Sequence, residues 1–190
     1  MPPRASASRG DAARASTSRP ADDRNVFVTV GTTSFDALVE ALDSPAVVDI
    51  LRARGYTSLT MQIGRGTYRP RRVRTRPGFR VDVFDFRPSL DEAMRAASLV
   101  VSHAGAGSVF EALGARAPLL VVVNESLMGN HQVELAEELR RRGHLRWCVP
   151  ADVEAALEAF DEADLEPYQP GDPARIASAI DRVLFEERRR

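Results

Sequence analysis

The segment from Val100 to Gln132 constrains the possible folds more than any other part of the chain. It predicts a buried strand, a glycine-rich loop, a helix, a second apolar strand, a polar loop and the start of another helix. Two near-continuous apolar strands joined by a helix are typical of a parallel sheet that is covered on both faces. Both loops would then leave the carboxyl edge of the sheet, where open α/β sheets bind ligands.

The two loops offer a ligand different groups. In the first, from His103 to Ser108, Gly105 and Gly107 lack the Cβ that would keep the backbone away from a phosphate. The second, from Asn124 to Gln132, is rich in side chains that bind hydroxyl groups. A loop suited to an anion beside a loop suited to hydroxyl groups indicates a nucleotide sugar.

The same alternation extends over residues 25–190, which we interpret as one domain. Strands are expected at 26–30, 58–63, 80–86, 99–102, 118–123 and 146–149. Helices are expected at 35–42, from Pro45 to near Gly55, from Ser89 onward, and at 108–115, 131–142, 151–161 and 173–187. This order predicts an α/β fold with right-handed crossovers and a doubly wound, Rossmann-like parallel sheet.

Local capping signals add detail to these helices. Ser34 is the expected N-cap of the first helix, and Ser89 with Glu92 has the spacing of a capping box. The run from Asp161 to Asp164 reads as an acidic helix face.

Composition excludes several classes of protein. Residues 1–24 are mostly Ala, Ser, Arg and Pro, which cannot offset the entropy of ordering, so we expect a disordered tail. A net charge of −1 provides no global field for nucleic acid. The single cysteine, Cys148, excludes a disulfide framework, and no apolar run reaches the roughly 20 residues of a membrane span.

The segment from Arg65 to Arg80 contains seven arginines and no acidic residue. A solvated basic loop is the default interpretation. An anionic membrane surface or a phosphate group is the second possibility. Nucleic acid is the third, because only Tyr68 and Phe79 could stack between bases.

Several candidate site residues have a structural alternative. Glu111 follows Ser108 with capping-box spacing, so it either satisfies the helix start or accepts hydrogen bonds from a ribose. His103 ends a buried strand, where a histidine is more often structural than catalytic. Asn130 could be a plain N-cap, followed by His131 and Gln132 in a solvated first turn, but their place beside a strand end favours sugar recognition.

Some motifs are missing. The chain has no Gly-x-x-x-x-Gly-Lys loop, and residues 103–108 lack the glycine spacing of a dinucleotide site. No Asp-x-Asp pair follows a strand, and no Cys/His set has metal-site spacing. We therefore expect neither a metal nor a cofactor.

At this level of detail the chain resembles glycosyltransferase family 28, and within it the small catalytic subunit of the eukaryotic two-subunit transferase that adds the second GlcNAc to dolichol diphosphate. The similar pieces follow one another through residues 26–150. They are VFVTVGTTSFDALV (26–39), LTMQIGRG (59–66), VDVFDF (81–86), LVVSHAGAGSVFEAL (99–113), PLLVVVNESLMGNHQVELAEEL (118–139) and WCVP (147–150). SHAG-x-GS and N-x-SLM-x-NHQ are the most specific of these motifs.

The resemblance implies a single donor-binding half of a GT-B enzyme that uses UDP-GlcNAc without a metal. It implies that Gly31 and Thr32 lie near the diphosphate, that His103, Gly105, Gly107 and Ser108 form a second phosphate-side loop, and that Glu111 binds the ribose. Asn130, His131 and Gln132 would read the GlcNAc hydroxyls.

The resemblance also implies a partner. A membrane-anchored subunit would supply the acceptor half and recruit this cytoplasmic chain to the cytosolic face of the endoplasmic reticulum. The acceptor would be lipid-linked GlcNAc, and the expected last helix at 173–187 could pack on its own domain or dock the partner.

The expected reaction is an inverting transfer that requires the partner. His131 is the candidate general base in this chain, although the base could belong to the partner. Two alternatives stay open: half of a bacterial split exopolysaccharide transferase, and a non-catalytic module that binds nucleotide sugar.

Overall fold

The computed structural model describes residues 24–73, 77–126 and 131–172, with residues 174, 177, 178 and 182 beyond them. Residues 1–23 of the predicted tail at 1–24 and most of the predicted helix at 173–187 therefore lie outside the described residues. Arg24 lies against the body, where its guanidinium sits 4.6 Å from the centre of the Tyr56 ring.

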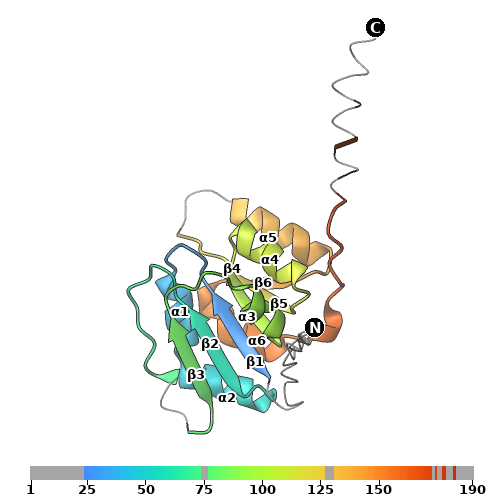
Figure 1. Ribbon diagram of the computed structural model, residues 1–190. Coiled ribbons are helices and arrows are strands. Elements are labelled where there is room, and N and C mark those ends of the chain that lie inside the picture. The colour runs from blue at the N-terminus through green and yellow to red at the C-terminus, as the bar shows by residue number, and fades with distance from the viewer. Residues whose placement is uncertain are drawn as a thin grey trace, which may run out of the picture.

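The described residues form a six-stranded sheet in which every neighbouring pair is parallel, in the order β3-β2-β1-β4-β5-β6 (Figure 1). The strands are β1 (Asn25–Thr29), β2 (Ser58–Gln62), β3 (Arg80–Phe84), β4 (Leu99–His103), β5 (Leu119–Val122) and β6 (Arg146–Cys148). The predicted doubly wound parallel sheet is confirmed.

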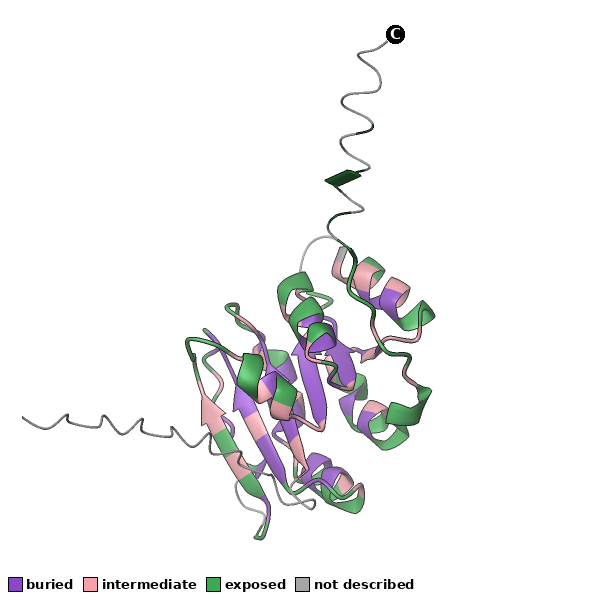
Figure 2. Ribbon diagram, turned by 45° about the vertical axis from the view of Figure 1, so that its right-hand side comes forward, coloured by how far each residue is buried: buried purple, intermediate pink, exposed green. Residues whose placement is uncertain are grey.

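Helices cover both faces of the sheet. They are α1 (Asp36–Leu42), α2 (Pro45–Ala53), α3 (Asp91–Ala96), α4 (Ala106–Gly114), α5 (His131–Arg141) and α6 (Val153–Ala159), with 3-10 turns at Pro150–Asp152 and Glu162–Asp164. Successive strand residues alternate between two cores: Val26 and Val28 pack with α1, α2 and α6, whereas Phe27 packs with α3, α4 and α5. Figure 2 shows the resulting arrangement, with buried central strands and exposed outer helix faces.

The predicted helix starts need correction. The N-cap of α1 is Phe35, not Ser34, and that of α3 is Leu90, so neither Ser34 nor the Ser89–Glu92 pair caps its helix. Ser89 Oγ instead accepts a hydrogen bond from the N–H of Asp91, 3.2 Å away, one position too early for a capping box. The predicted acidic helix face at Asp161–Asp164 is a single 3-10 turn in which Asp161 is the N-cap.

The crossover from β2 to β3 contains the arginine-rich segment and is held down by a buried carboxylate. Asp43, which is fully buried at the end of α1, accepts hydrogen bonds from the Tyr68 hydroxyl at 2.7 Å and from the backbone N–H groups of Arg71 and Val73 at 2.9 and 2.8 Å. Val73 is buried, whereas the described arginines of the segment are exposed. The default interpretation of a solvated basic loop therefore fits the described residues.

Candidate functional site

A cleft of about 720 Å³ opens at the carboxyl edge of the sheet, next to the boundary between β1 and β4. The strand order reverses at this boundary, so the loops after β1 and β4 diverge from neighbouring strands. The cleft is within the range of about 300–1,000 Å³ that is usual for ligand sites. Seven of the predicted site residues line it: Gly31, Thr32, His103, Gly105, Gly107, Ser108 and Glu111.

The His103 ring lies against two glycines that come from different loops. A Cβ added to Gly105 would lie 2.2 Å from His103 Nε2, and one added to Gly31 would lie 2.7 Å from His103 Cε1. Burial lowers the pKa of His103, which favours a neutral ring at pH 7. These glycines thus have a packing role that the sequence did not reveal, because they make room for an imidazole.

Helix α4 begins at the cleft with unpaired backbone donors. Its N-cap is Gly105, and its first backbone bond runs from the N–H of Val109 to the carbonyl of Gly105. Ser108 therefore lies inside the first turn and cannot form a capping box with Glu111. The structural alternative for Glu111 is wrong, and its exposed side chain lies on the wall of the cleft.

The opposite wall is the segment from Phe86 to Asp91, which follows β3 and was not among the predicted site residues. Phe86 is 52% exposed, and among the described residues it is one of two large hydrophobic residues that are exposed. The Arg87 guanidinium stacks 3.9 Å from the centre of the Phe84 ring, and Arg95 pairs with Asp91 at 2.9 Å. The sequence contained a signal for this wall. A parallel strand was expected at 80–86, and the residues that follow such a strand lie at the same edge of the sheet as the predicted loops.

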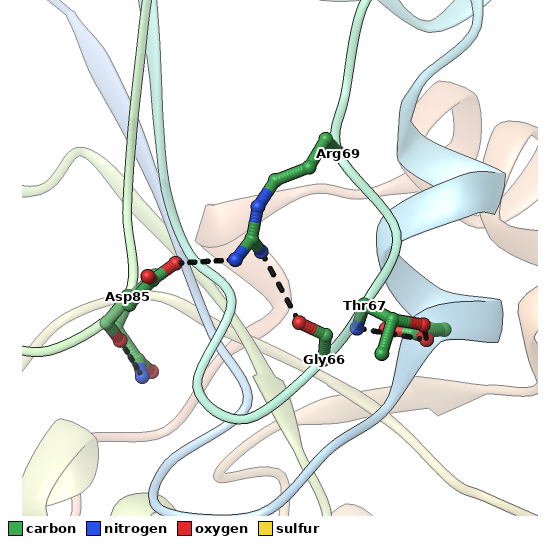
Figure 3. A network of polar contacts seen from close by, with 6 residues as sticks. Gly66, Thr67, Arg69 and Asp85 are labelled. Atoms are coloured by element: carbon green, nitrogen blue, oxygen red, sulfur yellow. Dashed lines mark hydrogen bonds and ion pairs between the residues drawn. The ribbon is translucent and has the colours of Figure 1, made fainter.

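A network of polar contacts joins the loop after β2 to the end of β3 (Figure 3). Arg69 lies between the Asp85 carboxylate, 3.4 Å away, and the Gly66 carbonyl, 3.1 Å away. The backbone N–H of Gly64 also donates to the Asp85 carbonyl at 3.2 Å. Gln62, which lines the cleft, bonds to the same carbonyl and was also missed by the sequence analysis.

The second predicted loop, from Asn124 to Gln132, starts at the same edge of the sheet. His103 and Val122 are register partners, so β4 and β5 end side by side. Asn124 Oδ1 accepts hydrogen bonds from the N–H and hydroxyl of Ser126. Asn130 lies outside the described residues, and of His131 the structure describes only the backbone that starts α5. Gln132, in the first turn of α5, is half-buried and does not line the cleft.

Within the ranges that the structure describes, no group of three or more His, Cys, Asp or Glu side chains could hold a metal ion. No helix in the same ranges is long and apolar enough to cross a membrane.

Comparison with known proteins supports the fold and the family. The model of the glycosyltransferase family 28 C-terminal domain matches residues 25–183. A UDP-N-acetylglucosamine transferase subunit ALG13 from Mus musculus is 51% identical over 148 residues, which cover 75% of this chain. The chain spans 13% of that protein and 11% of the corresponding protein of Homo sapiens.

Two solved structures have a similar fold. The NMR solution structure of ALG13 has a TM-score of 0.61 and 25% identity, with 87% of this chain and 96% of that chain covered. The crystal structure of MurG from Acinetobacter baumannii has a TM-score of 0.60 and 17% identity, with 77% and 44% covered. The predicted fold, one half of a GT-B glycosyltransferase, is thus confirmed.

Proposed function

Because the chain belongs to glycosyltransferase family 28, whose C-terminal domain it contains, we propose that it binds UDP-GlcNAc in this cleft and transfers the sugar to a lipid-linked acceptor. The observation that carries the proposal is the order of groups along α4. Gly105, Ser108, Glu111 and Gly114 all line the cleft, and they follow one another from the start of the helix to its end.

This order fits the parts of a nucleoside diphosphate. The helix start offers unpaired N–H groups and a partial positive charge, which favour the diphosphate. At a rise of 1.5 Å per residue, Glu111 lies about 9 Å further along the axis than Gly105, at a suitable place to accept hydrogen bonds from the ribose hydroxyls. Gly114 lies about one turn beyond, where the lack of a side chain leaves room for the base.

The wall across from α4 suits the base. Phe86 offers an exposed aromatic ring, and an aromatic ring can stack on a nucleobase. Arg87 lines the same wall, where its position is supported by the Phe84 ring. The base then lies at the far end of α4, and the sugar extends from the diphosphate in the opposite direction, toward α5. In this proposal the GlcNAc extends beyond the walls of the cleft toward the start of α5, where Asn130, His131 and Gln132 bind its hydroxyls.

The proposed reaction is an inverting transfer. The acceptor hydroxyl of GlcNAc-diphosphodolichol forms a bond to the anomeric carbon while the bond from that carbon to the UDP oxygen breaks. The negative charge that grows on the diphosphate is stabilised by donors fixed before the reaction, and each such donor is worth about 3 kcal/mol. A general base takes the acceptor proton, and His131 is our candidate. No metal is required in this proposal.

A partner completes the enzyme. The relatives named ALG13 are transferase subunits by name, and the family 28 C-terminal domain that this chain contains forms one half of a GT-B fold. We propose that a membrane-anchored subunit provides the acceptor half, so that the reaction takes place at the cytosolic face of the endoplasmic reticulum.

Titration calorimetry with UDP-GlcNAc, UDP-glucose and UDP tests donor binding. We expect Glu111→Ala to weaken UDP binding about 10- to 100-fold, which corresponds to one hydrogen bond to a charged group. Glu158→Ala is the matched control, because Glu158 is exposed on α6, on the opposite face of the sheet. Full UDP affinity in Glu111→Ala would contradict the ribose role, and UDP binding without sugar preference would contradict the assignment of GlcNAc.

Transfer is tested with the co-expressed partner. Radiolabelled GlcNAc from UDP-GlcNAc should appear in the lipid fraction only when both subunits are present. Binding of UDP-GlcNAc without transfer by the complex would favour the non-catalytic module instead.

A further inference from the structure

Gln62 is the last residue of β2, is 1% exposed, and has an amide whose hydrogen-bonding positions are all used. Its Oε1 accepts from the Thr29 hydroxyl at 2.6 Å and from the backbone N–H of Val30 at 3.2 Å. Its Nε2 donates to the carbonyls of Gly31 and Asp85, both at 2.8 Å. A side-chain amide can accept two hydrogen bonds through its oxygen and donate two through its nitrogen, so the Gln62 amide has no unused position.

These bonds connect the two walls of the cleft. Gly31 belongs to the loop after β1, beside His103 and α4, whereas Asp85 directly precedes Phe86 on the opposite wall. One buried side chain therefore bridges the two walls, in addition to the backbone bonds between the strands. The ion pair between Arg69 and Asp85 in Figure 3 spans the same junction, but its side chains are 52% and 55% exposed, so it contributes little.

The same amide also orients one peptide group. In a planar trans peptide, the carbonyl of one residue and the N–H of the next point in opposite directions. Because the Gly31 carbonyl points at Gln62, the N–H of Thr32 points away from Gln62. Within the described part of the chain this N–H has no acceptor, and Thr32 is exposed on the wall of the cleft.

We propose that Gln62 is a positioning residue, which holds the peptide between Gly31 and Thr32 so that the Thr32 N–H donates to the diphosphate of the bound nucleotide. This inference rests on the proposed function. Gln62 itself does not contact the reacting atoms. It acts through a backbone donor that is fixed before the ligand arrives, which is how a developing negative charge is stabilised most effectively.

The test is Gln62→Met, which removes the amide without adding charge. Calorimetry with UDP and chemical-shift titration with uridine separate the contribution of the diphosphate to binding from that of the nucleoside. We expect the affinity for UDP to fall about 10-fold or more, as for one lost charge-assisted hydrogen bond. The affinity for uridine should change less than about threefold, since its contacts lie further along α4. Equal losses for UDP and uridine would assign Gln62 a structural role only.

Ser58→Ala is the matched control. Ser58 is also 1% exposed on β2, but it lies at the opposite end of the strand and donates to Asn25 Oδ1 at 3.0 Å. We expect this variant to lower the unfolding temperature and leave both affinities unchanged. A loss of UDP affinity in Ser58→Ala as large as in Gln62→Met would overturn the inference.

If Gln62→Met does not fold, Thr29→Val tests the same point. The Thr29 hydroxyl donates to Gln62 Oε1 and accepts from the N–H of Gly31 at 3.1 Å, so its removal loosens both the amide and the Gly31 backbone and should lower the affinity for UDP more than that for uridine. An unselective loss in Thr29→Val would overturn the inference. Wild-type chain that binds neither UDP nor uridine would overturn the proposed function, and the inference with it.

Discussion

Replacement of Asp43 by asparagine tests how the crossover between β2 and β3 is held against the domain. The carboxylate is fully buried and accepts hydrogen bonds from the Tyr68 hydroxyl and from the N–H groups of Arg71 and Val73. Burial alone would raise the pKa of Asp43, but the N–H groups of Arg71 and Val73 and the Tyr68 hydroxyl hold it below its ordinary value of 3.8. This part of the fold therefore stabilises the ionised carboxylate of Asp43 relative to the protonated acid.

The cost of Asp43→Asn follows from the individual bonds. The remaining Oδ1 can still accept from Val73, and the Tyr68 hydroxyl can turn to accept from the new amide. The N–H of Arg71 then faces another donor, and one unsatisfied donor costs about 1–3 kcal/mol. For a domain of this size, about 2 kcal/mol lowers the unfolding temperature by about 4–8 °C.

Urea and thermal unfolding followed by circular dichroism measure this loss at pH 7. Asp82→Asn, an exposed aspartate on β3, is the control and should change stability by less than about 0.5 kcal/mol. Equal stability of the two variants would refute the role of Asp43. UDP affinity below the unfolding transition should not change, because Asp43 does not line the cleft.

The pH dependence provides a second test of the same reasoning. A carboxyl whose pKa is lower in the folded than in the unfolded state contributes stability above the unfolded value, and this contribution is lost as pH falls through the folded value. The stability difference between wild type and Asp43→Asn should thus be constant from pH 7 to about pH 5 and shrink below about pH 4. A difference that grows as pH falls would refute the assignment.

Two further predictions concern Gly31 and Cys148. Gly31→Ala should lower the free energy of unfolding by at least about 1–2 kcal/mol, because Gly31 has φ +64° and an added Cβ would lie 2.7 Å from His103. In urea unfolding, Gly107→Ala should show no such loss, since an added Cβ there meets no atom within 4 Å. Burial raises the pKa of the Cys148 thiol to about 12, so a disulfide reagent at pH 8 should label it only after unfolding, and rapid labelling of the folded chain would contradict its burial.

Sequence patterns predicted the elements better than the ends of the helices. The apolar runs of β4 and β5 identified buried parallel strands, because a strand covered on both faces must be apolar throughout. The capping patterns at Ser34, Ser89 and Ser108 predicted the wrong starts. The observed N-caps are Phe35, Leu90 and Gly105, and none of them makes a side-chain hydrogen bond to its helix. The starts of these helices are therefore set by the packing of the chain and not by a capping side chain.

The sequence by itself determined that this chain builds a parallel sheet with glycine-rich loops at its carboxyl edge, because periodicity and glycine position are local properties. Only the tertiary structure decided which loops meet. The reversal between β1 and β4 brings both Gly31 and Gly105 against the His103 ring. No spacing rule could predict that Gln62 bonds to both walls of the cleft. The carbonyls of Gly31 and Asp85, to which its amide donates, become neighbours only through the strand order.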